Sequence, residues 1–186
     1  MPSNLISALV FIVNALTSLY LLVLLLRFWL PWLRADFRNP LAQGILKMTS
    51  PVIIPLRRIV PSFGRLDTAT VLVAFVIQYA AVLLILLIFG TTASISVIAT
   101  TAVVKLVMLS INLFMFAIFV RIILSWISPG QYNPATAIIG TLTEPVLRPF
   151  RRLIPTIGGF DISPIFAIIL MGAATRLLMG FNQLGI

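Results

Sequence analysis

Four apolar runs alternate with polar, proline-rich stretches along this chain of 186 residues. The apolar runs cover residues 5–30, 68–88, 103–127 and 164–181. A helix of about 17–25 residues crosses a hydrocarbon core about 30 Å thick, so each run is long enough to span a membrane. The pattern therefore predicts an all-α integral membrane protein with four transmembrane helices.

The polar stretches, residues 32–66 and 128–160, each contain a signal for one short helix. Asn39 and Asn133 both precede a proline, and asparagine is a good N-cap while proline is tolerated at the first helical position. Apolar residues then recur at helical spacing, as Leu41, Ile45 and Met48 in the first stretch and as Ala135, Ile138, Ile139 and Leu142 in the second. We expect each helix to be amphipathic, to lie in the membrane interface, and to stop at Pro51 or Pro145.

A spaced motif that follows these helices occurs twice, 94 positions apart. Its first copy consists of Pro51, Pro55, Arg57, Arg58, Pro61, Gly64 and Asp67, and its second of Pro145, Pro149, Arg151, Arg152, Pro155, Gly158 and Asp161. The same offset relates Arg27 to Arg121 and Trp32 to Trp126. The chain therefore contains a duplicated unit, with residues 1–94 as the first repeat and residues 95–186 as the second.

Charge is scarce and unevenly placed. Only 9% of the residues are charged, against about 25% in average globular chains, and the net charge is +9. The basic residues gather in the two polar stretches, whereas the connection between the second and third apolar runs has none. By the positive-inside rule, loops 32–66 and 128–160 face the cytoplasm and both termini are extracytoplasmic. The two halves then share one orientation, as a parallel repeat in a multi-pass membrane protein.

The inventory of reactive side chains excludes several functions. The chain has no cysteine and no histidine, and its acids are Asp36, Asp67, Glu144 and Asp161. Disulfides, thiolate zinc sites, haem-binding histidines and histidine general bases are thus excluded. We expect no enzymatic activity, no metal and no cofactor. We also expect no nucleic-acid partner, because no basic domain stands clear of the apolar runs.

The motif set resembles the YggT (YlmG-like) family. It comprises Arg-x4-Trp at the end of a span, then Asn-Pro, then Pro-x3-Pro-x-Arg-Arg-x2-Pro-x2-Gly-x2-Asp before the next span. The resemblance implies a small bacterial inner-membrane protein with plastid relatives. It further implies a link to osmotic-shock tolerance and potassium handling, and in plastids to assembly of a cytochrome complex and to nucleoid organisation.

Five arginines of the polar stretches are the candidate lipid- or partner-binding set: Arg57, Arg58, Arg148, Arg151 and Arg152. One interpretation makes them topogenic charges and lipid-headgroup anchors. The other makes them a docking face for an anionic lipid or for an acidic segment of a partner, because prolines at fixed spacing hold the loop backbone. The two interpretations overlap, and the sequence leaves both open.

Two structural ion pairs are also expected. Arg27 and Asp67 should lie at the same membrane depth on neighbouring helices, and Arg121 with Asp161 should repeat the arrangement. An aspartate before each helix is also a natural N-cap.

Three further polar residues fall inside the apolar runs. Lys105 and Arg176 are both expected near the outer leaflet, with Arg176 the better candidate for a buried polar contact. Asn112 is expected to form a hydrogen bond between helices.

These features favour a non-enzymatic inner-membrane accessory protein. Its duplicated basic loops would bind anionic lipid or a partner membrane protein, in support of complex assembly or membrane and osmotic homeostasis. The alternative is an oligomeric ion-permeable unit or a modulator of potassium uptake. The sequence offers few residues suited to transport, because no acid is expected inside the bilayer to carry protons.

Overall fold

The computed structural model describes residues 3–64, 66–127, 133–154, 161–182 and 184–185, and these residues form six helices. The helices are α1 (Ser3–Trp32), α2 (Pro40–Arg57), α3 (Thr68–Phe89), α4 (Ile95–Ile127), α5 (Pro134–Leu153) and α6 (Ser163–Met179). Within this part of the chain, the one β-type pairing is an isolated bridge between Phe63 and Leu66. The all-α prediction is confirmed.

Three of the described helices, α1, α3 and α4, are long and apolar enough to cross a membrane. The expectation of four such helices is wrong, because the fourth apolar run forms the shorter helix α6 of 17 residues. At about 1.5 Å per residue, α6 is about 26 Å long, which is the lower limit for crossing a hydrocarbon core of about 30 Å. Helix α6 begins at Ser163 and ends at Met179, and a turn follows at Gly180.

Helices α2 and α5 begin where the Asn-Pro pairs predict. Asn39 accepts a hydrogen bond from the backbone of Leu41, and Asn133 forms a reciprocal capping box with Thr136. The predicted stops at Pro51 and Pro145 are wrong, because α2 continues to Arg57 and α5 to Leu153.

Packing explains why these helices continue past their prolines. A proline inside a helix removes one backbone hydrogen bond and crowds the preceding turn. Beyond Pro51 and Pro145, however, Ile53 of α2 and Leu147 of α5 are fully buried. Each helix contains two such prolines, and burial of one side chain, which contributes about 1.5–3 kcal/mol, offsets part of their cost. Tertiary contacts therefore decide where α2 and α5 end.

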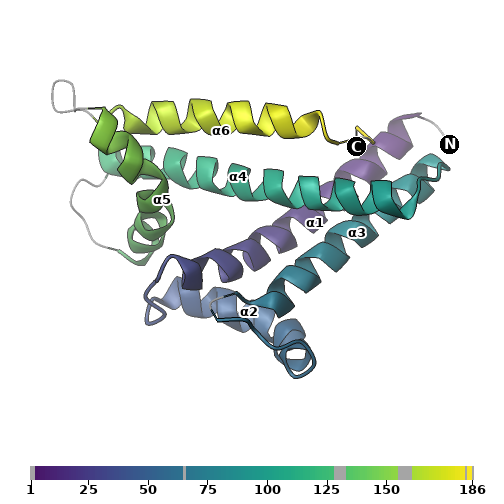
Figure 1. Cartoon of the computed structure of the whole chain (residues 1–186), viewed down its shortest axis with the longest axis horizontal. Coiled ribbons are helices and arrows are strands. Elements are labelled where there is room, and N and C mark those ends of the chain that lie inside the picture. Colours follow the sequence, from purple (N-terminus) through teal and green to yellow (C-terminus); the bar gives the residue numbers. More distant parts are fainter. Residues whose placement is uncertain (1–2, 65, 128–132, 155–160, 183, 186) are drawn as a thin grey trace.

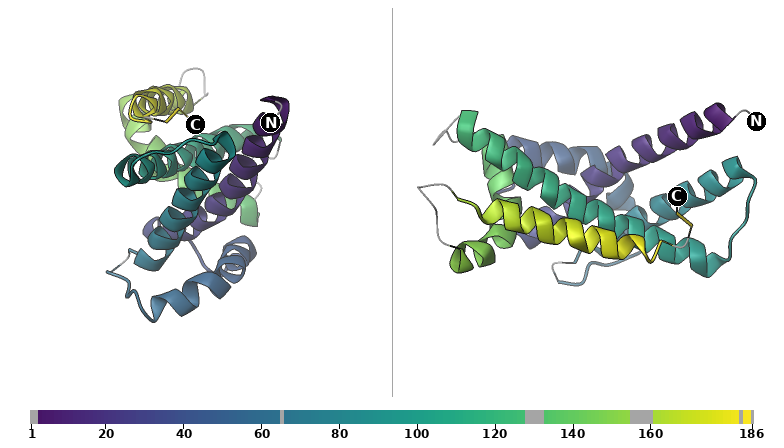
Figure 2. Two further views of the ribbon diagram at one scale, coloured as in Figure 1. Left: turned by 90° about the vertical axis from the view of Figure 1, so that its right-hand side faces the viewer. Right: turned by 90° about the horizontal axis from the view of Figure 1, so that it is seen from above.

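The helices form two packed groups, α1 with α2 and α3, and α4 with α5 and α6 (Figure 1). Helix α1 packs along α3, helix α4 packs along both α3 and α6, and α2 and α5 lie across the ends of the long helices (Figure 2). One buried cluster, which includes Leu30, Ala42, Phe114 and Leu142, joins α1, α2, α4 and α5. The side chain of Asn39 also donates to the carbonyl of Pro134 at 2.7 Å, so the two Asn-Pro starts touch.

Helices α2 and α5 lie at one end of the molecule, and both chain termini lie toward the other (Figure 1). The uncharged turn between α3 and α4 lies at the same end as the termini. The arginine motifs are therefore gathered at one end of the long helices. Pro155 and Gly158 of the second motif lie outside the described residues.

Candidate functional site

Arg27 is the centre of the first arginine cluster. It lies near the end of α1 and is only 4% exposed. Its Nη1 donates to Thr49 Oγ1 at 2.7 Å, to the Leu46 carbonyl at 3.2 Å and to Ser50 Oγ at 3.3 Å, all in α2. Its Nε lies 3.6 Å from Asp67 Oδ2. One buried guanidinium thus ties α1 to α2 and to the start of α3, and the expected contact of Arg27 with Asp67 is present.

Asp67 is the N-cap of α3 and carries most of the contacts at this junction. Arg57 binds it bidentately, with Nε donating to Oδ1 at 3.2 Å and Nη2 donating to Oδ2. Thr70 donates to the same carboxylate from its hydroxyl at 2.6 Å and from its backbone N–H. Burial alone raises the pKa of Asp67, but the bonds from Arg57 and Thr70 outweigh it and hold that pKa below its ordinary value. The carboxylate therefore stays charged between two arginines.

The second cluster repeats the first contact with a different carboxylate. Arg121 Nη1 donates to Thr143 Oγ1 at 2.7 Å, the distance of the matching bond in the first repeat. It also donates to Glu144 Oε2 at 3.1 Å. Among the described residues, Glu144 is the carboxylate that Arg121 pairs with, so the expected partner, Asp161, is corrected. The reason is local, because Glu144 stands where the first repeat has Ser50.

Asp161 pairs instead with Arg151, as Asp67 pairs with Arg57. Arg151 Nε donates to Asp161 Oδ2 at 2.7 Å, and its Nη1 donates to Glu144 at 2.9 Å. Burial raises the pKa of Asp161, but the bonds from Ser163 and Arg151 lower it by more. This pair is more open than the first, because the side chain of Asp161 is 33% exposed and that of Asp67 is 7% exposed.

Sequence reasoning missed the threonines and Glu144. Thr49 and Thr143 are both fully buried, and each hydroxyl also donates to a carbonyl of its own helix at 2.7 Å. The signal was present, because the two threonines obey the same 94-residue offset as the motif. A lone threonine in an amphipathic helix does not by itself indicate a partner for a buried arginine.

The five candidate binding arginines divide into two groups. Arg57 and Arg151 pair with Asp67 and Asp161, so part of their charge is neutralised within the chain. Arg58, Arg148 and Arg152 are exposed, and no ion pair joins them to another residue that the structure describes. We call these three the displayed arginines. Arg58 directly follows α2, and Arg148 and Arg152 belong to α5.

The three polar residues predicted inside the apolar runs have different surroundings. Lys105 Nζ donates to Asn14 Oδ1 at 3.1 Å and so joins α4 to α1. Asn112 is largely exposed but lines a small cavity that Lys105 also lines. Arg176, the better candidate for a buried contact, is exposed on α6, so that expectation is corrected. Its neighbour Thr175 is the residue that faces inward.

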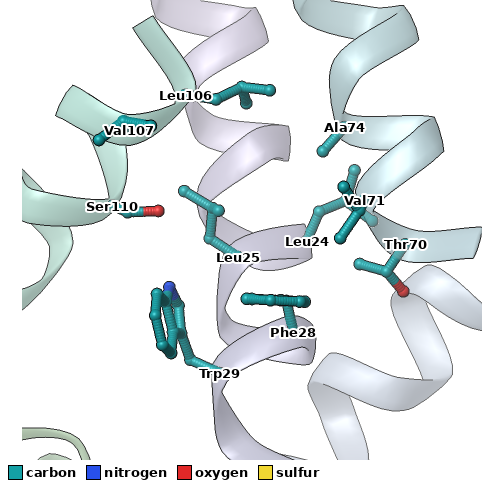
Figure 3. A pocket seen from close by; sticks show the side chains of 10 residues that line it. All are labelled: Leu24, Leu25, Phe28, Trp29, Thr70, Val71, Ala74, Leu106, Val107 and Ser110. Atoms are coloured by element: carbon teal, nitrogen blue, oxygen red, sulfur yellow. The ribbon is translucent and has the colours of Figure 1, made fainter. Parts of the chain in front are cut away.

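An apolar pocket of about 240 Å³ lies between α1, α3 and α4 (Figure 3). Leu24, Leu25, Phe28 and Trp29 form its α1 wall, and the hydroxyl of Ser110 reaches it from α4. None of its ten lining residues is an acid, a lysine or an arginine. Its surface therefore suits a hydrocarbon chain and offers no acid–base chemistry.

Three long apolar helices with arginine clusters at one end are typical of a multi-pass helical membrane protein. The CCB3/YggT family model matches the chain twice, over residues 6–88 and 100–182. The chain therefore belongs to the CCB3/YggT family, and the two matches coincide with its two repeats.

Named relatives agree with this assignment. The "Uncharacterized protein PA0392" of Pseudomonas aeruginosa is 43% identical over 165 residues, covering 88% of this chain and 84% of the relative. The "Uncharacterized protein YggT" of Escherichia coli K12 is 34% identical over 165 residues, covering 89% and 86%. The "YlmG homolog protein 2, chloroplastic" of Arabidopsis thaliana is 36% identical over 72 residues, covering 37% and 27%. No solved structure matches the chain.

Proposed function

We propose that this chain is a non-enzymatic accessory protein of the bacterial inner membrane. Its two basic segments, α2 and α5 with the arginines that follow them, bind anionic lipid headgroups or an acidic segment of a partner membrane protein. Both segments face the cytoplasm in this proposal, because they hold the excess of basic residues and the turn between α3 and α4 holds none. In the cell, such binding supports complex assembly or membrane and osmotic homeostasis.

The proposal rests on one observation: some arginines pair with carboxylates in the part of the chain that the structure describes, and the displayed arginines do not. Arg27, Arg57, Arg121 and Arg151 share three carboxylates, those of Asp67, Glu144 and Asp161, so most of their charge is neutralised within the chain, and these pairs fix the segments against the long helices. The displayed arginines have no such partner among the described residues. A basic residue near an anionic membrane surface contributes about 1 kcal/mol of attraction, so the three together are worth about 3 kcal/mol.

The positions of the acids favour binding over proton-coupled transport. All four, Asp36, Asp67, Glu144 and Asp161, lie outside the three membrane-length helices. A proton relay needs titratable groups within the spans, and Lys105 alone cannot form a chain of them. The bundle therefore lacks the parts that a proton-driven carrier uses.

Neutralising the displayed arginines should weaken retention of anionic lipid. The variant Arg58→Gln/Arg148→Gln/Arg152→Gln should retain phosphatidylglycerol at least about tenfold less than the wild type, because about 1 kcal/mol is lost per charge. Native mass spectrometry of the detergent-purified protein, with phosphatidylcholine as the neutral comparison lipid, measures this directly.

A matched variant separates position from net charge. Arg34→Gln/Arg38→Gln/Lys47→Gln removes the same charge from exposed residues outside the duplicated arginine motif. It should retain distinctly more phosphatidylglycerol than the first variant. Equal losses would mean that the segments act through net charge alone, and full retention by the first variant would refute lipid binding. A protein that copurifies with the wild type but not with the first variant would identify a partner as the occupant.

A further inference from the structure

A small polar cavity lies among α1, α3 and α4, remote from both arginine clusters. Its volume is about 180 Å³, and its lining comprises Ser18, Gln78, Lys105, Met108, Leu109, Asn112 and Asn182. At about 1.5 Å per residue, Lys105 lies roughly 24 Å along α4 from Arg121. If the arginine clusters mark one surface of the membrane, the cavity falls inside the hydrocarbon core, toward the opposite surface.

The ammonium of Lys105 has no carboxylate to neutralise it. One of its three N–H donors reaches Asn14, which is neutral, and no ion pair joins it to a described residue. The four acids of the chain lie in the loop after α1, at the start of α3, in α5 and just before α6. These positions are at the end of the molecule that holds α2 and α5 (Figure 1). A cation inside a membrane protein normally pairs with an anion, so this one calls for a partner from outside the chain.

Gln78 gives an independent indication of a ligand. Its side chain lines the cavity and is 95% buried, since only 5% of its surface is exposed. No hydrogen bond joins its amide to another residue that the structure describes. Buried polar side chains are nearly always hydrogen-bonded, so the amide is poised for a group that enters the cavity.

We propose that this cavity binds a phosphate-type oxyanion. Lys105 supplies the positive charge, and Gln78, Asn112 and Ser18 supply neutral hydrogen-bond donors. Because none of the lining residues carries a negative charge, the same surface disfavours a cation. The anion is either the phosphate of a phospholipid headgroup from the leaflet opposite the arginine clusters or free inorganic phosphate. None of the displayed arginines lines this site, so failure of one of the two proposals does not decide the other.

The test measures both anions on the intact protein in detergent. Inorganic phosphate binding is measured by calorimetry, and retained phosphatidylglycerol by native mass spectrometry with Arg58, Arg148 and Arg152 already changed to Gln. Lys105→Met should weaken binding of whichever anion the wild type binds by at least about tenfold. The reason is that hydrogen bonds to a charged group are stronger than those between neutral groups. Arg176→Met is the matched control, because it removes the same charge from an exposed position on α6 and should leave binding unchanged.

A second variant keeps the test decisive if Lys105→Met is unstable. Gln78→Glu places a carboxylate against the same cavity, so it should pair with Lys105 and abolish anion binding without lowering the melting temperature. Loss of lipid alone would assign the site to a headgroup, and loss of inorganic phosphate alone would assign it to the free anion. The proposal is overturned if the wild type binds neither anion, or if Lys105→Met binds as tightly as the wild type.

Discussion

Asp67→Ala should destabilise the protein much more than Asp161→Ala, although the two residues are equivalent in the repeats. Removing Asp67 leaves the guanidinium of Arg27, which is 4% exposed, without its carboxylate. Breaking a buried pair by deleting one partner costs about 3–5 kcal/mol. Removing Asp161 breaks a pair that is 33% exposed on each side, where the cost is about 0–1 kcal/mol. Asp67 is also the N-cap of α3, which adds about 1 kcal/mol to its loss, whereas Asp161 stands one residue before Ile162, the N-cap of α6.

Unfolding of both variants in detergent, followed by circular dichroism against sodium dodecyl sulfate, measures this difference. Asp67→Asn is the control that removes the charge while keeping a side chain that can cap α3. It should lose most of what Asp67→Ala loses. Equal destabilisation by Asp67→Ala and Asp161→Ala would show that the buried pair adds nothing beyond the cap.

Thr49→Val should be the next most destabilising change. Valine matches threonine in shape but removes the hydroxyl that accepts from Arg27 at 2.7 Å. A hydrogen bond to a charged group contributes about 1.5–3 kcal/mol, and Thr49 is fully buried, so water cannot replace the hydroxyl. The same denaturation assay checks this loss.

Two comparison variants separate the hydrogen bond from packing. Thr49→Ser keeps the hydroxyl and should lose distinctly less stability than Thr49→Val. Thr143→Val should also lose less, because the side chain of Arg121 is 29% exposed and keeps Glu144. A Thr49→Ser variant as unstable as Thr49→Val would mean that the methyl group, rather than the bond to Arg27, matters at this position.

The repeat, the helix caps and the Arg27–Asp67 contact were predictable because they depend on spacing alone. Both Asn-Pro pairs start a helix, as the preferences of asparagine and proline at helix starts predict, and a 94-residue offset is visible without any structure. The ends of α2 and α5 were not predictable in this way. Proline is a local signal, and it was overridden by the burial of Ile53 and Leu147, which depends on the packed helices.

The partner of Arg121 could not be predicted from the repeat offset alone. The offset assigns Asp161 to Arg121, yet one exchange between the repeats, Glu144 in place of Ser50, supplies a carboxylate that Arg121 contacts at 3.1 Å. Transferring contacts between repeats is therefore safe only where the surrounding residues also match. Both residues of the Arg27–Thr49 hydrogen bond match between the repeats, and the Arg121–Thr143 bond has the same length of 2.7 Å.

The cysteine-free sequence allows a direct test of the central claim, that both basic segments face the cytoplasm. Single-cysteine variants Ser62→Cys and Arg152→Cys report on the two segments, and Thr91→Cys reports on the turn between α3 and α4; all three positions are exposed. With a membrane-impermeant maleimide, Thr91→Cys should label in intact spheroplasts, and the other two should label only in inverted vesicles. Labelling of Ser62→Cys and Arg152→Cys from opposite sides, or of both from outside, would contradict the account.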